Sequence, residues 1–541
     1  MLLALVAVVA AGPFGLLGSS AAPAPSVSPR PGATAVVAVS SSAIASPDAE
    51  ASEPTASEPA PAPQAPGPVA IVDEPIVPVT QFRATQTSTS ADEVAAVLNG
   101  TSDRYVALEL VKGEADAILA ALKVDRPADA SRLVLAANRD ALARDLAANR
   151  KRLAFLRADA VEPDVRALAW GGTALFGVDR VRKLGDWPLT ARLPAPTAAA
   201  AFDPATTWTL FAGGDIMLDR GVYETLAVKG KGADFPFNGG TAEITGRCRN
   251  CSPLGWDTPY TRRTGNAGAV RHVVSKADIA IANFENPAPD KPSWHRSGTV
   301  FSAAPRFING LADAGIDYVS LANNHIRDAG GAGLLQTIKN VTNRGIAVSG
   351  AGKNLAAARK PAVLEAAGTK VAILGYDAIA GSYHATATKI GSAPLTAANV
   401  KADVAAARKA GADVVIVFPH WGTEYDPTPF ANQKKLAHMA IDAGADMVIG
   451  NHAHWAAAME IYGGRPIWYA LGNFVFDQTW SEPTMEGITL ELTFRGSELV
   501  QVGLRPHIIL DKAQPNFLDP AGSGRVVMGQ VYQASRGLLP W

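Results

Sequence analysis

Short apolar runs rich in strand-forming residues alternate with helix-like stretches through the second half of this 541-residue chain. The apolar runs are Trp208–Ala212, Asp278–Ala282, Tyr318–Leu321, Val371–Leu374, Val414–Phe418, Met447–Ile449 and Ile467–Leu471. The helical stretches between several of them are Ala304–Ala314, Leu334–Asn343, Val400–Ala410 and Gln433–Ala443. This alternation predicts an α/β domain centred on a sheet. Two further runs, Glu486–Phe494 and Leu499–Leu510, predict antiparallel strands nearer a sheet edge.

The overall charge is nearly balanced, because 49 Lys and Arg residues face 50 Asp and Glu residues. A net charge of −1 gives no global attraction to nucleic acid or to an anionic bilayer, so we do not expect a nucleic-acid partner. Apolar residues make up 48% of the chain, enough for a large core. Two cysteines cannot hold together a chain of this length, which excludes a disulfide-built scaffold.

The N-terminal segment has the layout of an export signal. Met1–Ala11 is unbroken and apolar, Pro13 follows, and the small residues Ser19–Ala22 resemble a cleavage site, although no basic residue precedes the run. We therefore predict a signal peptide over residues 1–22, with an N-terminal membrane anchor as the alternative. Residues 23–76 are rich in Pro, Ala and Ser without periodicity, which predicts a disordered linker. The protein is thus expected to be exported, and either secreted or anchored at the cell surface.

A small α/β domain is predicted over residues 77–193. Tyr105–Val111 and Arg132–Ala136 are strand-like, whereas Ala115–Leu122 and Arg139–Leu156 are helix-like. The sequence indicates no function for this domain. Pro194 and Pro196 mark a second linker over 194–206. We expect the large domain to occupy 207–515 and a C-terminal extension to occupy 516–541.

Polar side chains follow the strand-like runs of the large domain. They are Asp215 after the first run, Asn283 and Glu285 after the second, Asn323, Asn324 and His325 after the third, His420 after the fifth, and His452 and His454 after the sixth. The carboxyl ends of strands in an open α/β sheet face one crevice, so these side chains are expected to be neighbours.

The residue types favour a transition-metal site. Carboxylate oxygens, an Asn carbonyl and neutral imidazoles together suit Zn²⁺, Mn²⁺ or Fe²⁺. His452 and His454 lie two positions apart on a predicted loop, where they can serve two neighbouring metals, and a carboxylate can bridge such a pair.

Each of these residues alone has a plain structural explanation. Asp215 can cap a helix, Asn323 and Asn324 can form a turn, and His420 can be a buried histidine. The recurrence at five strand ends is what favours a shared site. Five other histidines lack this context and are interpreted as surface or packing residues: His272, His295, His384, His438 and His507.

Over Trp208 to Arg505, the motifs resemble the CapA family of poly-γ-glutamate capsule-synthesis proteins. The matching stretches are Gly214–Leu218 with Arg220, Asn283–Glu285, Leu321–His325 with Asp328, His420–Tyr425, Gly450–His454 and Tyr469–Gln478. The resemblance implies a calcineurin-like metallophosphoesterase fold, a four-layer αββα sandwich with two facing sheets flanked by helices.

The resemblance also implies roles for individual residues. The implied metal ligands are Asp215, Glu285, Asn324, His420, His452 and His454. His325 would be a general acid, with Asp328 as its orienting partner. Arg220 and Glu424 would touch the substrate or support the ligands, and Asn283 and Asn473 are expected on the substrate side.

Three departures from the family pattern bear on the metals. Met217 stands where phosphoesterases of this superfamily usually carry a histidine. Glu285 replaces an aspartate, and Asn451 and Ala453 replace residues common in the family's His-x-His loop. We therefore expect two metal sites, one of them weaker.

The two cysteines, Cys248 and Cys251, fall in a Gly-rich insertion between the first two motifs. A structural zinc would need a second pair of ligands, and no other cysteine exists. We expect a local disulfide, with a redox pair as the alternative.

Two functions are compatible with these features. The first is a metal-dependent hydrolase that cuts a phosphoester or a γ-glutamyl amide during synthesis of an envelope polymer. The second is a non-catalytic accessory protein that binds or guides an anionic polymer at the cell surface. The expected partners are that polymer or the machinery that makes it.

Overall fold

The computed structural model describes residues 70–196, 201–379 and 381–540 of the chain. The predicted export segment, 1–22, lies outside these ranges, as does the predicted linker 23–76 up to residue 69. Across the described part, no helix has the length and apolar character needed to cross a lipid bilayer.

The predicted small domain contains a mixed sheet with the order β4-β3-β5-β1-β6, in which β8 also pairs with β1. Its elements are β1 (Ile71–Gln81), β2 (Ser88–Thr89), α1 (Ala91–Leu98), β3 (Ala107–Val111), α2 (Ala115–Leu122), β4 (Leu133–Ala136), α3 (Arg139–Ala148), β5 (Arg152–Arg157), β6 (Val165–Ala167), β7 (Ala169–Trp170) and β8 (Thr190–Pro194). The helices and strands enclose one apolar core. The α/β composition agrees with the sequence, but the helix expected over Arg139–Leu156 ends at Ala148, and Arg152–Arg157 forms strand β5 instead.

The start of this domain differs from the predicted boundary at residue 77. Strand β1 begins at Ile71, so residues 71–76, which include Pro75 and were assigned to the linker, belong to the sheet. It pairs with β8 over its first half and with β5 over its second half, so each half has a hydrogen-bonded neighbour. The hydrogen bonds to β8 and β5 therefore make this stretch a strand, although its composition is typical of a linker.

The larger sheet of the second domain has the order β11-β10-β26-β25-β24-β9-β12-β13-β14, and β23 also pairs with β9. Its strands are β9 (Thr207–Ile216), β10 (Thr241–Cys248), β11 (Thr258–Gly265), β12 (Ile279–Phe284), β13 (Tyr318–Ser320), β14 (Ala347–Ser349), β23 (Asn473–Val475), β24 (Glu486–Arg495), β25 (Glu498–Leu510) and β26 (Gln514–Leu518). Strands β24 and β25 are antiparallel as expected. They lie inside the sheet, however, because β26 and β10 extend it beyond them.

The second sheet of this domain has the order β16-β17-β19-β20-β22-β21. Its strands are β16 (Ala362–Ala366), β17 (Thr369–Asp377), β19 (Val414–His420), β20 (Met447–Ile449), β21 (Met459–Tyr462) and β22 (Arg465–Trp468). The central strands β17, β19, β20 and β22 are parallel. A separate short pair joins β15 (Ala351–Gly352) and β18 (Gly391–Ser392).

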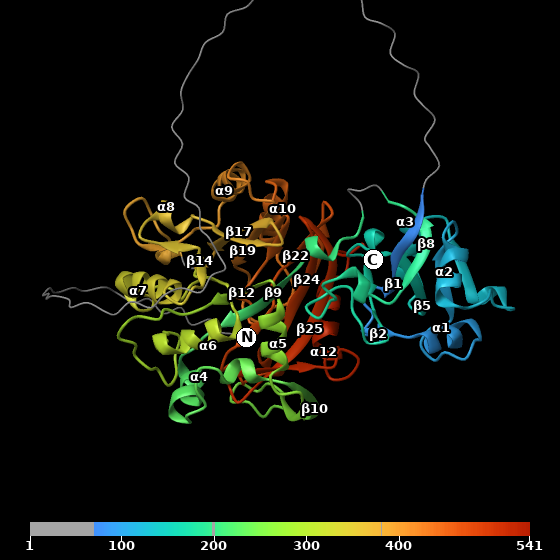
Figure 1. Cartoon of the computed structure of the whole chain (residues 1–541). Coiled ribbons are helices and arrows are strands. Elements are labelled where there is room, and N and C mark those ends of the chain that lie inside the picture. Colours follow the sequence, from blue (N-terminus) through green and yellow to red (C-terminus); the bar gives the residue numbers. More distant parts are fainter. Residues whose placement is uncertain (1–69, 197–200, 380, 541) are drawn as a thin grey trace, which may run out of the picture. The chain divides into compact units, whose positions relative to one another are not determined.

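The two sheets face each other across an apolar layer. This layer contains side chains of β9 and β12 from one sheet and of β17 and β19 from the other. Helices α5 (Ala269–Lys276), α6 (Ile308–Ala314) and α7 (Gly330–Thr342) cover the outer face of the first sheet. Helices α9 (Ala397–Lys409) and α10 (Ala431–Asp442) cover the second, beside β17 and β19 (Figure 1). The four-layer αββα prediction is confirmed.

The C-terminal residues belong to this sandwich rather than forming the predicted extension 516–541. Strand β26 runs across the predicted boundary. Helix α12 (Arg525–Ala534) then packs Val527, Met528 and Val531 into the layer between the sheets. The remaining short helices are α4 (Arg220–Tyr223), α8 (Leu355–Ala358) and α11 (Glu482–Met485).

The Gly-rich insertion forms the β10–β11 hairpin. A disulfide joins Cys248 at the end of β10 to Cys251 in the following turn, which confirms the predicted local bond.

Asp317, just before β13, provides a test of how the core tolerates charge. Burial raises the pKa of this carboxyl to about 6, and the Ala280 N–H that it accepts at 2.8 Å offsets only part of the effect. A carboxyl with a raised folded-state pKa destabilises the fold once it ionises. The free energy of unfolding should therefore fall as pH rises from about 4 to 6 and stay level above that. Asp317→Asn should remove this fall, a gain of about 1–2 kcal/mol at pH 7, measured by denaturant melts from pH 4 to 8. The exposed neighbour Asp313, changed to Asn, should leave the pH dependence as it is.

Candidate metal centre

The strand ends of both sheets bring the predicted residues together. Asp215 lies near the end of β9, Glu285 directly follows β12, and His420 ends β19. A close backbone approach sets the position of Asp215. A Cβ on Gly214 would lie 1.8 Å from the carbonyl oxygen of Gly472, so only glycine lets the two chains approach this closely. The Asp215 N–H donates to that same oxygen at 3.0 Å.

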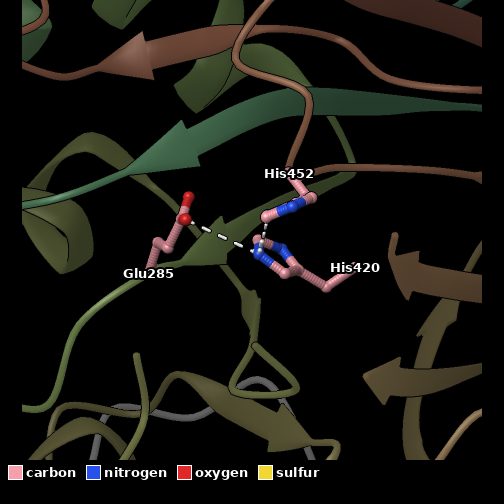
Figure 2. Close-up of side chains that lie close together, drawn as sticks. All are labelled: Glu285, His420 and His452. Atoms are coloured by element: carbon pink, nitrogen blue, oxygen red, sulfur yellow. Dashed lines mark hydrogen bonds and ion pairs between the residues drawn. The ribbon is translucent and has the colours of Figure 1, made fainter. Parts of the chain in front are cut away.

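The first group of candidate ligands surrounds Nε2 of His420. This atom lies 3.0 Å from Nδ1 of His452, 2.7 Å from Oδ1 of Asn324 and 3.5 Å from Oε1 of Glu285. Figure 2 shows the side chains of Glu285, His420 and His452 pointing toward one another. Two imidazoles, an amide oxygen and a carboxylate thus converge on one point.

The second group shares Glu285 with the first. Oε1 of Glu285 lies 3.8 Å from Nε2 of His454, and Oδ2 of Asp215 lies 3.4 Å from Nδ1 of His454. Among the histidines and carboxylates of each group, one ligand atom per residue lies within 4.8 Å of the others. Glu285 is therefore placed where a carboxylate can bridge two cations.

The donors in both groups fit a divalent transition metal. Glu285 has no exposed surface, and neither carboxylate oxygen has a hydrogen-bond partner among the described residues. Its nearest charged groups are the imidazoles of His420 and His454, and a buried carboxylate without hydrogen bonds is costly unless it pairs with a cation or binds metal. Mixed nitrogen and oxygen donors suit Zn²⁺, Mn²⁺ or Fe²⁺ better than Mg²⁺ or Ca²⁺.

The three buried imidazoles of the site differ in the direction of their pKa shifts. Burial alone would lower the pKa of His454, but the charges of Glu285 and Asp215 outweigh burial and raise it to about 9. The same balance raises the pKa of His420, with Glu285 as the main opposing charge. Burial lowers the pKa of His452 well below its usual value, and the charges of His420 and His454 add to this. Bound cations would favour the neutral imidazoles that ligate metal.

The loop after β20 holds its two histidines in an uncommon backbone conformation. His452 has φ of 92° and His454 has φ of 56°, both in the left-handed region. Such conformations are costly for residues with a side chain and are frequent at functional sites. The His452 N–H donates to Oδ2 of Asp215 at 3.2 Å, which ties this loop to β9.

Asn283 and Asn473, which were predicted on the substrate side, hydrogen-bond to candidate ligands through their amides. Nδ2 of Asn283 donates to Oδ1 of Asp215 at 2.7 Å, and its Oδ1 accepts from Asn323 at 3.3 Å. Oδ1 of Asn473 lies 2.9 Å from Nδ1 of His454, and its Nδ2 donates to the carbonyl oxygen of Thr484. Both amides are buried and engaged with protein partners. Because Nδ1 of His454 donates to Oδ1 of Asn473, Nε2 is the ring nitrogen of His454 that faces Glu285.

His325 and Asp328 form the predicted contact. Nδ1 of His325 lies 2.9 Å from Oδ2 of Asp328. The Asp328 carboxylate also accepts the hydroxyl of Tyr383 and the N–H of Phe301, each at 2.9 Å. The Phe301 ring packs on the imidazole, with centroids 4.2 Å apart. Nδ1 of His325 therefore faces Asp328. The ring is also close enough to His452 for its charge to lower the pKa of His452.

Arg220 and Glu424 differ in their surroundings. The guanidinium of Arg220 pairs with Asp477 at 2.5 Å, donates to the Gly298 carbonyl at 2.9 Å and lies over the Phe301 ring. Arg220 thus contacts the same ring that packs on His325. Glu424 is exposed, in the loop between β19 and α10.

An aromatic cluster beside His454 was not predicted. The ring of Tyr425 lies 6.0 Å from that of His454 and 4.8 Å from that of Trp480, while Trp256 lies 5.8 Å from Trp455. Tyr425 directly follows Glu424, and Trp455 directly follows His454, so the sequence places these two rings beside predicted site residues. Trp256 and Trp480 come from other loops, and nothing in their local sequence marks them.

Met217 belongs to an apolar cluster. Its side chain is fully buried in the apolar layer between the first sheet and its helices. Its sulfur accepts the Asp219 N–H at 3.0 Å. The position at which the resemblance led us to note a missing histidine thus supplies packing here.

Known proteins resemble this chain over the same region. The family model "Bacterial capsule synthesis protein PGA_cap" matches residues 209–478. The capsule biosynthesis protein CapA of Bacillus anthracis is 34% identical over 288 residues, which cover 51% of this chain and 70% of that protein. A Mycobacterium tuberculosis protein named "Probable polyglutamine synthesis accessory protein" is 31% identical over 290 residues, covering 50% and 74%. A solved calcineurin-like phosphoesterase, YfkN from Bacillus subtilis, gives a TM-score of 0.32 at 12% identity over 61% of this chain and 97% of that one.

Proposed function

This chain belongs to the CapA family of bacterial capsule synthesis proteins, and we propose that it carries a metal-dependent hydrolase site that acts in the synthesis of a cell-envelope polymer. The bond cut would be a phosphoester or a γ-glutamyl amide. The observation that carries the proposal is the Glu285 carboxylate, which is buried without a hydrogen-bond partner in the described chain and lies between His420 and His454.

Two cations would be held by this chain's own donors. His420, His452 and Asn324 would hold one, His454 and Asp215 the other, and Glu285 would bridge them. When bound, such cations stabilise negative charge on a phosphoryl or acyl oxygen and lower the pKa of water. The second group has one candidate ligand fewer than the first, because Met217 contributes none, so we expect it to bind its cation more weakly.

The protein residues would handle the leaving group and the geometry. His325 would hold a proton for the leaving-group oxygen. Asp328 contacts Nδ1 of His325 and so orients the ring, and Tyr383 and Phe301 fix Asp328 in turn. Asn473 and Asn283 keep His454 and Asp215 in place. The ring of Tyr425 would bound the substrate beside His454.

A second candidate is a non-catalytic accessory protein that binds or guides an anionic polymer. Two observations favour it: the missing ligand at Met217, and the word "accessory" in the name of the Mycobacterium tuberculosis relative. In either case the partners would be the polymer or its synthesis machinery. We further propose that the protein is exported, on the strength of its apolar N-terminal segment.

The test is hydrolysis by the purified chain loaded with Mn²⁺, Zn²⁺ or Fe²⁺. Aryl and alkyl phosphodiesters and γ-glutamyl peptides form the substrate panel. We expect turnover of at least one class that stops on chelation and returns when metal is restored. Stoichiometric metal without turnover of any substrate would favour the accessory function instead.

A further inference from the structure

A cavity of about 250 Å³ lies between the small domain and the larger sheet of the sandwich. One wall comes from residues 166–169 and 174–177 of the small domain, and the other from β24 and β25. None of its lining residues belongs to either ligand group. The family model does not extend to the small domain, so family membership assigns this cavity no role.

Hydrogen bonds across the cavity hold its walls together. The side chain of Gln501 accepts the Ala167 N–H at 2.7 Å and donates to the Val165 carbonyl at 3.0 Å. The Gly177 N–H donates to Oγ1 of Thr493 at 2.9 Å. Because both ends of the small-domain wall are attached to the sheet, the cavity is preformed.

The acidic side chains at the cavity already have partners. Oε1 of Glu491 accepts the Val178 N–H at 2.8 Å, and its Oε2 accepts from Nε of Arg505 at 2.5 Å. Asp179 lies at the rim, where its exposed carboxylate contacts Nε2 of His272 at 2.6 Å.

Arg166 is the charged side chain of the cavity for which the described residues provide no ion-pair partner. Its Nε is buried without a hydrogen-bond partner, and its guanidinium makes no ion pair with any residue in the described ranges. Burial lowers the pKa of Arg166, although the group stays charged at any physiological pH. A third guanidinium, that of Arg83, lies nearby over the ring of Tyr532, which also faces Arg166. The region therefore carries more positive than negative charge.

We propose that this cavity binds a small oxyanion, a carboxylate or a phosphate group, through the Arg166 guanidinium. The planar fork of arginine matches both groups, and an anion would compensate a charge that has no protein partner. The rest of the lining is largely apolar, including Leu168, Leu175, Phe176 and Leu504, and suits an aliphatic stem. The volume corresponds to roughly eight water molecules, so a single group fits and a folded segment does not.

The experiment is calorimetric titration of the full chain with three probes: inorganic phosphate, L-glutamate and a γ-glutamyl dipeptide. It is run on the wild-type protein and on a His452→Ala, His454→Ala background, which removes phosphate binding at the metal centre. We expect at least one probe to bind in both, and Arg166→Ala to weaken it by about tenfold or more. Preference for phosphate or for the glutamyl probes identifies which oxyanion the cavity takes.

Two control variants make the test specific. Arg150 is an exposed arginine of the same domain, and Arg150→Ala should leave affinity unchanged. Arg166→Lys keeps the charge without the fork and should weaken binding less than Arg166→Ala does, which also covers failure of the alanine variant to fold. The proposal is overturned if no probe binds at millimolar concentration, or if folded Arg166 variants bind as the wild type does. Because the readout persists in the metal-centre background, its failure is distinct from failure of the proposed hydrolase.

Discussion

Replacing His452 and His454 together with alanine should reduce the metal content of the purified chain to near zero. Each ligand group loses an imidazole: the first keeps one imidazole, His420, beside the oxygens of Glu285 and Asn324, and the second keeps only the carboxylates of Asp215 and Glu285, too few donors to hold a transition metal through dialysis. Even loss of a residue that only supports a ligand typically costs about 10- to 100-fold in metal affinity, and loss of a ligand itself should cost more. Elemental analysis by plasma mass spectrometry, after dialysis of both proteins against the same buffer, gives the metal-to-protein ratio.

The single variants separate the two groups. His452 belongs only to the first group, His454 only to the second, and Glu285 to both. His452→Ala and His454→Ala should therefore each remove one metal, whereas Glu285→Gln should weaken both. His438→Ala is the matched control, because this half-buried histidine also contacts a carboxylate, Glu460 at 2.8 Å, outside the centre. Unchanged metal content in the double variant would rule out the proposed centre.

The repeated strand and helix pattern predicted a sheet-centred α/β domain, the family resemblance implied the four-layer sandwich, and the polar residue types at the strand ends predicted a shared site. Asp215 and Glu285 are neighbours because β9 and β12 are adjacent parallel strands whose carboxyl ends share one edge. His420 ends β19 of the other sheet and joins them because the two sheets face each other. Neighbouring loops can then add ligands, as the one carrying His452 and His454 does.

The contacts of Asn473, the start of strand β1 and the unpaired Arg166 could not be predicted, because they depend on residues far apart in the sequence. Asn473 fits a substrate role by position, yet its amide is used by His454 and Thr484, which only the fold reveals. The start of strand β1 has the composition of a linker. It is nevertheless a strand, because it pairs with β8 and β5, which lie far from it in the sequence. Arg166 resembles any surface arginine in the sequence, and its missing partner is visible only once the two domains meet.

His325→Ala should lower kcat by about 100- to 10,000-fold while leaving metal content and KM close to those of the wild type. Its imidazole touches none of the ligand atoms of the two groups, and it is held by Asp328 and the Phe301 ring. A proton that it supplies is needed only as the leaving group departs, so its loss should affect kcat rather than binding. Steady-state kinetics on the best substrate of the panel, with metal analysis on the same samples, measures both quantities.

The choice of leaving group distinguishes proton donation from general damage to the site. A nitrophenolate leaves without protonation, whereas an alkoxide does not, so His325→Ala should lose far more activity on alkyl than on nitrophenyl esters. Asp328→Asn keeps the size of the side chain and removes its charge, and it should show the same dependence with a smaller loss. Equal losses on both ester types would contradict a general-acid role. If cells carrying His325→Ala make normal amounts of polymer while cells without the protein make none, the essential role is binding rather than hydrolysis, because the polymer then needs the protein's presence and not its proton donor.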